Sequence, residues 1–273
     1  MDYSGMTTLL LCPRLYKYQY VDKLAPAEEA PALNFGTAWH KIMEYHNKGH
    51  ENPLEALNDL GYIDPAGDYR TREKLIKAYE MWRTQYAETP WEVLLAEQGV
   101  QGVDFEGRVD GVVRTRAFGE MELSLWLVDY KTTSRLETDW ITTYHVSDQF
   151  KLYLRALRQQ YPELRGVLVD VYHATKGNKS ASSEGERIGN RFYRQYLLYE
   201  EVELQEANQD LRMALAVKDL YEQHGYWPKN TKACHHFNRA CPFLDVCDAA
   251  DPEIKARLLS GFKPNTFDPL AEG

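Results

Sequence analysis

Apolar residues in the first third of the chain recur every three or four positions, the spacing of helices that bury one face. The first such segment is interrupted at Cys12-Pro13, where proline is tolerated because the first N–H groups of a helix have no internal partner. The pattern predicts helices over residues 5–21 and over about 53–60 and 70–88. It predicts another within "FGTAWHKIMEYHNK", which opens after Gly36-Thr37. This part of the chain is therefore expected to be mainly α-helical.

The pattern changes near Trp91, where β-prone segments begin. Three of them are separated by glycine-containing turns and predict an antiparallel meander: "WEVLLAEQGV", "VDFEGRVDGVVRT" and "MELSLWLVDYKTT". A long helix is expected from about Thr138 to Tyr161, followed by two more strands in "RGVLVDVYHAT" and "RFYRQYLLYE". An amphipathic helix over about 201–224, a cysteine-bearing segment and a tail from Gly261 complete the chain.

No internal repeat and no linker divides the chain. With 273 residues, of which 44% are hydrophobic, it can bury a sizeable core. We expect one α/β domain over residues 1–260, with a central mixed β-sheet flanked by helices. Its parts are a helical portion (1–90), a core (91–200) and a helix with the cysteine segment (201–250), followed by a tail (261–273).

The charge of the chain restricts how it could bind nucleic acid. A net charge of −9 argues against a broad basic surface, so such binding would depend on a local basic cleft or on metal ions. The stretch "ATKGNKSASSEGERIGNR" could supply a mobile basic contact or be a solvated loop between strands. No apolar run reaches the ~18 residues of a membrane span, and the first residues lack signal-peptide features. We therefore expect a cytoplasmic protein.

The strand "LWLVDYKTTS" ends on two opposite charges. Side chains alternate along a strand, so Asp129 and Lys131 share one face and Tyr130 points to the other. In the preceding strand, alternation predicts an apolar face with charged residues opposite: Phe105, Val109, Gly111 and Val113 against Glu106, Arg108 and Asp110. If the two strands pair, Asp110 approaches Asp129 and Lys131 lies beside both.

Two carboxylates held close together repel each other unless a proton or a cation neutralises them. Oxygen ligands favour a hard divalent cation such as Mg²⁺ or Mn²⁺. Such an ion would support phosphodiester hydrolysis by lowering the pKa of a bound water, while Lys131 positions the nucleophile or stabilises developing charge. The alternative for Asp129 and Lys131 is an ordinary ion pair at a strand end.

"GRVDGVV" followed by "LWLVDYKTT" resembles the core of the PD-(D/E)XK nucleases, in which an Asp precedes an (Asp or Glu)-x-Lys on the next strand. Asp110, Asp129 and Lys131 match these positions, and Val109-Asp110 stands where the pattern has Pro-Asp. This resemblance implies a restriction-endonuclease-like fold.

Two more motifs resemble the RecB-like branch of that superfamily. "FGTAWHKIMEY" is similar to its Gly-x-x-x-His helix, with His40 at the histidine, and "DQFKLY" to its Gln-x-x-x-Tyr motif, with Gln149 and Tyr153 one helical turn apart. Taken singly, His40 reads as a packing histidine, and Gln149 and Tyr153 as surface and core residues. Their joint occurrence, in the same order and spacing, favours the functional interpretation.

The resemblance implies a role for each of these residues. His40, Asp110, Asp129 and the backbone carbonyl of Tyr130 would ligate the metal, and Lys131 would serve the attacking water. Gln149 and Tyr153 would orient the lysine or the nucleic-acid backbone. Glu97 could add a further carboxylate or be an exposed glutamate at a strand edge.

The four cysteines are Cys12, Cys234, Cys241 and Cys247. Four thiolates can hold zinc or an iron–sulfur cluster, and buried free thiols are the third interpretation. "CPRLYKYQY" and the three late cysteines resemble the iron–sulfur subgroup of RecB-like nucleases, including AddB-type subunits and CRISPR-associated adaptation nucleases. That subgroup has C-x2-C where this chain has six residues between Cys234 and Cys241, so His235 or His236 could replace a thiolate. The resemblance favours a structural [4Fe-4S] cluster over Zn²⁺.

The motifs together imply a metal-dependent DNA nuclease, acting as an exonuclease on single-stranded or frayed ends. A companion helicase, recombinase or CRISPR adaptation protein is expected, because the chain carries no helicase P-loop. A site-specific endonuclease would carry a sequence-reading domain, which is not evident here. The rival from another class is a non-catalytic nucleic-acid-binding or scaffolding subunit of a recombination, repair or CRISPR-adaptation complex. Such a protein would be expected to lose the aspartates or the lysine, and this chain retains them.

Overall fold

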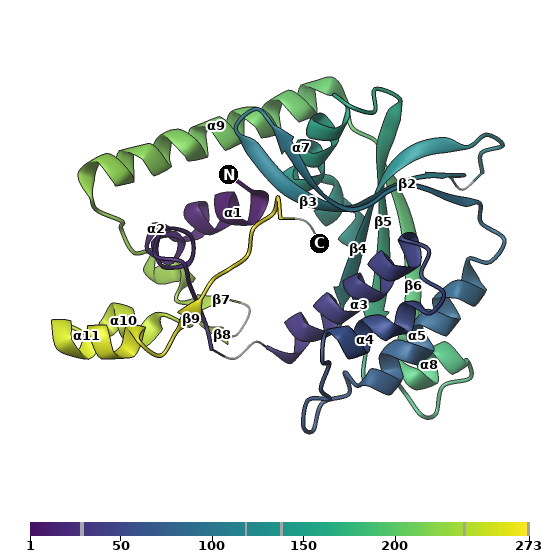
Figure 1. The fold of residues 1–273 in the computed structure, drawn as a ribbon, viewed down its shortest axis with the longest axis horizontal. Coiled ribbons are helices and arrows are strands. Elements are labelled where there is room, and N and C mark those ends of the chain that lie inside the picture. Colours follow the sequence, from purple (N-terminus) through teal and green to yellow (C-terminus); the bar gives the residue numbers. More distant parts are fainter. Residues whose placement is uncertain (28–29, 118, 137–138, 237–238, 272–273) are drawn as a thin grey trace.

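A computed structural model describes residues 1–27, 30–117, 119–136, 139–236 and 239–271 (Figure 1). Its centre is a five-stranded mixed sheet in the order β2-β3-β4-β5-β6. β4 and β5 are parallel, and the other neighbouring pairs are antiparallel. The strands are β2 (Trp91–Gly102), β3 (Phe105–Thr115), β4 (Ser124–Thr133), β5 (Leu164–Ala174) and β6 (Asn190–Leu197). This arrangement confirms the predicted restriction-endonuclease-like α/β fold and the meander of its first three strands.

Helices cover both faces of the sheet (Figure 1). On one face lie α3 (Pro31–Asn47), α4 (Ala56–Asp59) and α5 (Arg72–Gln85). On the other lie α1 (Tyr3–Leu11), α7 (Asp148–Leu157) and α9 (Glu201–His224). The side chains of β4 alternate between the two cores. Leu125 and Leu127 pack on the α7 side, and Trp126 and Val128 pack on the α3 side. Burial on both faces explains its nearly continuous apolar run.

Two predicted helices have different bounds in the structure. The helix expected over 138–161 is two helices, α6 (Trp140–His145) and α7, and Thr138 lies outside the described residues. The break falls at Ser147, which is extended (φ −67°, ψ 122°), as serine favours positions that flank helices. α3 begins at Pro31, not after Gly36-Thr37, because proline suits the first helical position.

Gly36 therefore lies inside α3, where it allows a close approach to β4. A Cβ at this position would stand 3.0 Å from Oγ1 of Thr132, the residue after Lys131. The absence of a side chain lets α3 pack tightly beside the end of β4. This contact brings the His40 turn of α3 next to the charged strand end.

The expected apolar face of β3 is wrong in part. Phe105 and Val109 pack on the α7 side, as does Val112, whereas Val113 packs on the α3 side. Strict alternation cannot put Val109 and Val112, three residues apart, on the same side, so it is interrupted at Asp110-Gly111. The neighbouring strand β2 is irregular in the same region, with a register shift between Val93 and Leu95.

The remaining elements connect and fasten these layers. The stretch proposed as a mobile basic contact contains α8 (Glu184–Ile188), and the buried Lys74 amine donates to the carbonyls of Thr175, Ile188 and Gly189. The stretch is thus attached to α5 through Lys74.

Among the described residues, no helix combines the length and apolar character needed to cross a membrane. The other elements are α2 (Pro13–Tyr16), η1 (Lys17–Val21), β1 (Leu24–Ala25), η2 (Pro53–Glu55), η3 (Thr231–Ala233), β7 (His235–His236), β8 (Arg239–Ala240), α10 (Leu244–Asp248), α11 (Pro252–Leu259) and β9 (Lys263–Pro264).

Candidate active site

The two aspartates of the motif meet where β3 and β4 part. The last ladder pair between these strands joins Gly111 to Val128, and one further step of the same register brings Asp110 opposite Asp129. Asp110 Oδ2 accepts a hydrogen bond of 2.6 Å from the backbone N–H of Tyr130. Its Oδ1 lies 3.2 Å from Nδ1 of His40 on α3. The carboxylate is therefore held between the catalytic strand candidate β4 and helix α3.

Lys131 joins the second aspartate to α7. Its ammonium nitrogen lies 2.6 Å from Asp129 Oδ2 and donates to Gln149 Oε1 at 3.4 Å. The Gln149 amide in turn donates to the hydroxyl of Tyr153 at 3.4 Å, one helical turn further on. The side chains that the motifs singled out thus form two contact chains, His40–Asp110 and Asp129–Lys131–Gln149–Tyr153, which the bond from the Tyr130 N–H to Asp110 brings together at the end of β4.

The carboxylates and their partners shift one another's pKa values. Burial acts to raise the pKa of Asp110, but the His40 and Lys131 charges and the Tyr130 N–H outweigh it and lower that pKa. Burial raises the pKa of Asp129, Lys131 opposes this rise, and the charge of Asp110 adds to it. Burial acts to lower the pKa of Lys131, but the two aspartates outweigh it and raise that pKa to about 12. Lys131 is therefore a cation in this arrangement, suited to donate hydrogen bonds and to attract a phosphate.

Glu97 is the acidic residue that sequence reasoning underrated. It stands opposite Asp110 in the β2–β3 register, between the pairs Ala96–Gly111 and Gln98–Val109. Its side chain is only 16% exposed and lies 3.6 Å from Arg108, so it is not an exposed glutamate at a strand edge. Burial, followed by the charge of Asp110, raises the pKa of Glu97 to about 7. Glu97, Asp110 and Asp129 therefore form a row of carboxyl groups across three adjacent strands.

Backbone strain accompanies this row. Glu97 has φ +43°, a left-handed conformation that is unfavourable for a residue with a Cβ. Residues held in such conformations concentrate at functional sites, where the surrounding structure imposes them.

A second missed acid, Glu44, follows His40 by one turn of α3, is 6% exposed and is paired with Lys41 and Lys48. Its four-residue spacing from His40 was the signal in the sequence that could have identified it.

The carboxylates and the imidazole of this group are the side chains that could hold a metal ion. In the described part of the chain, no three His, Cys, Asp or Glu side chains are arranged to hold one. The carboxylates are instead turned toward His40 and Lys131. The chemistry of the group nevertheless suits a hard cation, since it combines carboxylate oxygens with an imidazole. Asp129 Oδ2 is buried without a well-aligned hydrogen bond among the described residues, and its charge is offset by the Lys131 ammonium at 2.6 Å.

The four cysteines gather at the junction of the two ends of the chain. The backbone N–H of Cys241 donates to the carbonyl of Cys234, and the N–H of Asn230 donates to Sγ of Cys12 at 3.4 Å. Burial raises the pKa of the Cys241 thiol, and the charges of the other three cysteines raise it further. The His236 side chain, considered as an alternative ligand, lies outside the described residues.

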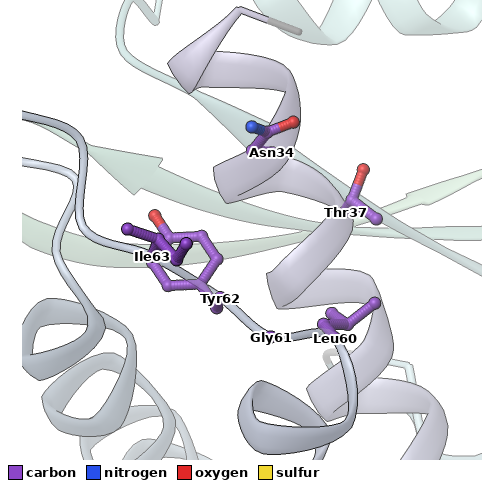
Figure 2. Close-up of a pocket in the computed structure, with 6 residues that line it drawn as sticks. All are labelled: Asn34, Thr37, Leu60, Gly61, Tyr62 and Ile63. Carbon is purple, nitrogen blue, oxygen red and sulfur yellow. The ribbon is translucent and has the colours of Figure 1, made fainter. Parts of the chain in front are cut away.

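A small pocket borders α3 one turn before His40 (Figure 2). Its volume is about 290 Å³, just below the usual range of small-molecule sites, which begins at about 300 Å³. Asn34 and Thr37 come from α3, and Leu60, Gly61, Tyr62 and Ile63 from the loop after α4. None of these six residues is an acid, a histidine, a lysine or an arginine, so the pocket offers neither a charged side chain nor an imidazole.

Comparison with known proteins identifies the family. A candidate exonuclease from Eubacterium rectale has a similar fold, with a TM-score of 0.51 and 12% identity over 92% of this chain and 88% of that one. LHK-Exo, solved in complex with dAMP, is 12% identical over 70% of this chain and 96% of that one, with a TM-score of 0.27. No curated protein matches the chain. The family model of the PD-(D/E)XK nuclease superfamily matches residues 3–248, and the chain therefore belongs to that superfamily.

Proposed function

We propose that this nuclease is a RecB-like, Mg²⁺- or Mn²⁺-dependent exonuclease that degrades DNA from single-stranded or frayed ends. The observation that carries the proposal is the group at the end of β4, where Asp110 accepts from the Tyr130 N–H and Lys131 joins the nearby Asp129 to Gln149. PD-(D/E)XK nucleases typically use these two metal ions, and DNA is the substrate expected for the fold. A purely scaffolding subunit would have no need for the buried, mutually repelling carboxylates, which cost stability.

Each residue of the group has a proposed part in the reaction. His40, Asp110, Asp129 and the Tyr130 carbonyl would hold the metal ion, which when bound supplies a water of lowered pKa and offsets charge on the phosphate. Lys131 donates its protons toward the scissile phosphate and the attacking water. Gln149 and Tyr153 keep the Lys131 side chain extended toward Asp129, because each is hydrogen-bonded to the next.

The proposal is tested with end-labelled DNA incubated with the purified protein and Mg²⁺ or Mn²⁺. Linear single-stranded DNA is expected to be shortened from its ends, while covalently closed circular single strands stay intact. Nicking of the circles would instead identify an endonuclease, and equal cleavage of a matched RNA would remove the preference for DNA. If the wild-type protein and its Asp129→Asn variant leave all substrates intact, but both bind them equally, the non-catalytic alternative is correct.

Replacing Glu97 by glycine is expected to separate stability from activity. Glycine accepts φ +43° without strain, so the free energy of unfolding should be unchanged or rise by about 1 kcal/mol. The loss of the third carboxylate from the row should lower the cleavage rate about tenfold or more. Urea unfolding and the end-labelled DNA assay measure the two effects.

Glu92→Gly is the matched control, because Glu92 is an exposed glutamate on the same strand, paired with Arg114 at the surface. This variant should lose some stability, since glycine weakens a strand, and should keep its cleavage rate. Wild-type cleavage by the Glu97→Gly protein would assign Glu97 a structural role only.

We also propose that the four cysteines hold a [4Fe-4S] cluster, with Zn²⁺ as the alternative. The support is the donor set: four partly or fully buried thiols, with Cys12 brought to the late cysteines by the bond from the Asn230 N–H to its Sγ, and Cys241 bonded to Cys234 through the backbone. Such a cluster would fasten the N-terminal segment to residues 234–247 within the single domain of residues 1–260. A helicase, a recombinase or a CRISPR adaptation protein is the proposed companion of the nuclease in the cytoplasm.

Cys12→Ser is expected to remove the cluster, because one of its four ligands is lost. Wild-type protein purified without oxygen should be brown, with a broad absorption in the visible spectrum, and the variant should be pale. Proteolysis near residues 234–247 should become faster, since ligand loss uncouples the two chain ends. If the wild-type protein is colourless and contains stoichiometric zinc, the four cysteines hold Zn²⁺ and not an iron–sulfur cluster.

A further inference from the structure

A second cavity lies on the α3/α5 face of the sheet, away from Asp129 and Lys131. Its volume is about 370 Å³, within the range of small-molecule sites. It is bounded by the last turn of α5, the start of β2, the end of α3 and β6. We call it the back pocket and define it by the six residues that carry its chemistry: His46, Trp82, Arg83, Tyr86, Trp91 and Arg194.

Arg194 is the central charge of the back pocket. Its side chain is 7% exposed, and its Nε donates to Asp170 Oδ2 at 2.8 Å. Among the described residues, neither of its terminal nitrogens, Nη1 and Nη2, has a hydrogen-bond acceptor. Arginine usually engages a carboxylate through two parallel hydrogen bonds, and here the contact is single. Because an unpaired buried donor costs about 1–3 kcal/mol, these two nitrogens are suited to an acceptor that enters from outside.

Aromatic rings surround this cation. The Arg194 guanidinium lies 3.6 Å from the ring centre of Tyr86, 4.4 Å from that of Trp91 and 5.3 Å from that of Trp82. These rings fix the plane of the guanidinium and hold it at the pocket wall. Flat apolar walls also favour a planar ligand, because aromatic groups stack against each other.

The side chains that line the back pocket carry two positive charges, and that of Arg194 is partly offset by its partner, the buried Asp170 carboxylate. Arg83 adds an exposed guanidinium at the opening, and no Asp or Glu is among the residues that line the cavity. Burial and the charges of Arg83 and Arg194 lower the pKa of His46 to about 4, so this histidine stays neutral at pH 7. An anion is therefore favoured over a cation at this place.

We propose that the back pocket binds a nucleotide, with its phosphate against Arg194 and Arg83 and its base against the aromatic rings. The choice of a nucleotide among planar anions rests on the proposed nuclease function. The same chemistry is offered by a free deoxynucleoside 5′-monophosphate, which is an exonuclease product, and by one nucleotide of a DNA strand. The pocket is separate from the catalytic group, since Lys131 and Asp129 lie on the α7 side of β4.

The test measures binding to the full-length protein in EDTA, so that no DNA is cleaved, by quenching of tryptophan fluorescence and by calorimetry. The probes are dAMP, deoxyadenosine, inorganic phosphate and an eight-nucleotide single strand. Arg83→Gln is the informative variant, because Arg83 is exposed and its loss should not unfold the protein. Trp91 is left unchanged, because it donates to Asn47, which holds the Tyr130 hydroxyl behind the catalytic strand.

Wild-type protein is expected to bind dAMP or the strand saturably, and more tightly than phosphate or deoxyadenosine. Arg83→Gln should weaken this binding about tenfold or more, as expected for a charge-assisted hydrogen bond. Lys77→Gln removes an exposed cation from the same helix and should have no effect. Tighter binding of dAMP identifies the free product as the ligand, and tighter binding of the strand identifies DNA.

Three results would overturn the proposal. In the first, no probe binds saturably. In the second, phosphate binds as tightly as dAMP and the strand. In the third, Lys131→Ala abolishes binding and Arg83→Gln preserves it. The last would move the ligand to the catalytic group. Cleavage of end-labelled DNA with Mg²⁺ is measured separately, so a protein that cleaves DNA but fails this binding test retains its proposed function and loses only the back-pocket proposal.

Discussion

Replacing Lys131 by alanine is expected to lower the rate of DNA cleavage roughly 10²- to 10⁴-fold, the range for loss of a group that stabilises transition-state charge or transfers a proton. The ammonium lies 2.6 Å from Asp129 Oδ2 and is oriented by Gln149, so its removal takes away the positive charge nearest the carboxylates. The fold should survive, because Asp129 can take up a proton when its cation is lost. Single-turnover cleavage of end-labelled DNA measures the rate, and circular dichroism the fold.

Lys151→Ala is the matched control for this experiment. Lys151 is a lysine on α7 that is more buried than Lys131, and it contacts Asp148 and the carbonyl of Val146, not the motif aspartates. Its loss should change stability slightly and leave the cleavage rate within about twofold, since it touches no group proposed to act on the phosphate. If the Lys131→Ala protein cleaves DNA as fast as the Lys151→Ala protein, the assignment of Lys131 is wrong.

Most of the fold could be predicted because the period of the apolar residues reports which faces are buried. The five strands and the helices α5 and α9 follow from that signal alone. The errors lie where local chemistry competes with the period. Ser147 interrupts the helix that was expected over 138–161, and α3 begins at Pro31, before the expected start after Gly36-Thr37. Both residues are helix-end signals that can be read in the sequence. The reversal of faces at Asp110-Gly111 breaks the strict alternation of a strand, and no pattern within β3 reveals it.

The residues of the candidate site could be proposed from the sequence, because they stand at the spacings of the motifs. Their distances could not be predicted, since these depend on how α3 and α7 pack against β4. Glu97 was underrated for a physical reason: its importance depends on a left-handed backbone angle and on the register with Asp110, and neither is visible in "WEVLLAEQGV". The back pocket was missed because its residues come from four separate elements and match no motif.

The ion pair between Asp170 and Arg194 is a further feature that only the structure reveals. The two residues are partners in the β5–β6 ladder, and Asp170 is also the ladder neighbour of Tyr130 in β4. Asp170 is fully buried and accepts hydrogen bonds from Arg194 Nε and from the indole of Trp82 at 3.0 Å. This pair therefore supports the sheet directly beside β4, the strand that carries Asp129 and Lys131.

Asp170→Asn is expected to lower the free energy of unfolding by about 3–5 kcal/mol, because it leaves the Arg194 guanidinium buried without a counter-charge. Urea unfolding followed by circular dichroism measures the loss. The exposed pair Glu73–Lys77 supplies the control, since Glu73→Gln should cost less than about 1 kcal/mol. The double variant Asp170→Leu, Arg194→Leu should recover much of the lost stability, because removing both charges also removes the cost of burying them. A double variant as unstable as Asp170→Asn would mean that the stabilisation comes from packing around Tyr86 and Trp91 and not from charge pairing.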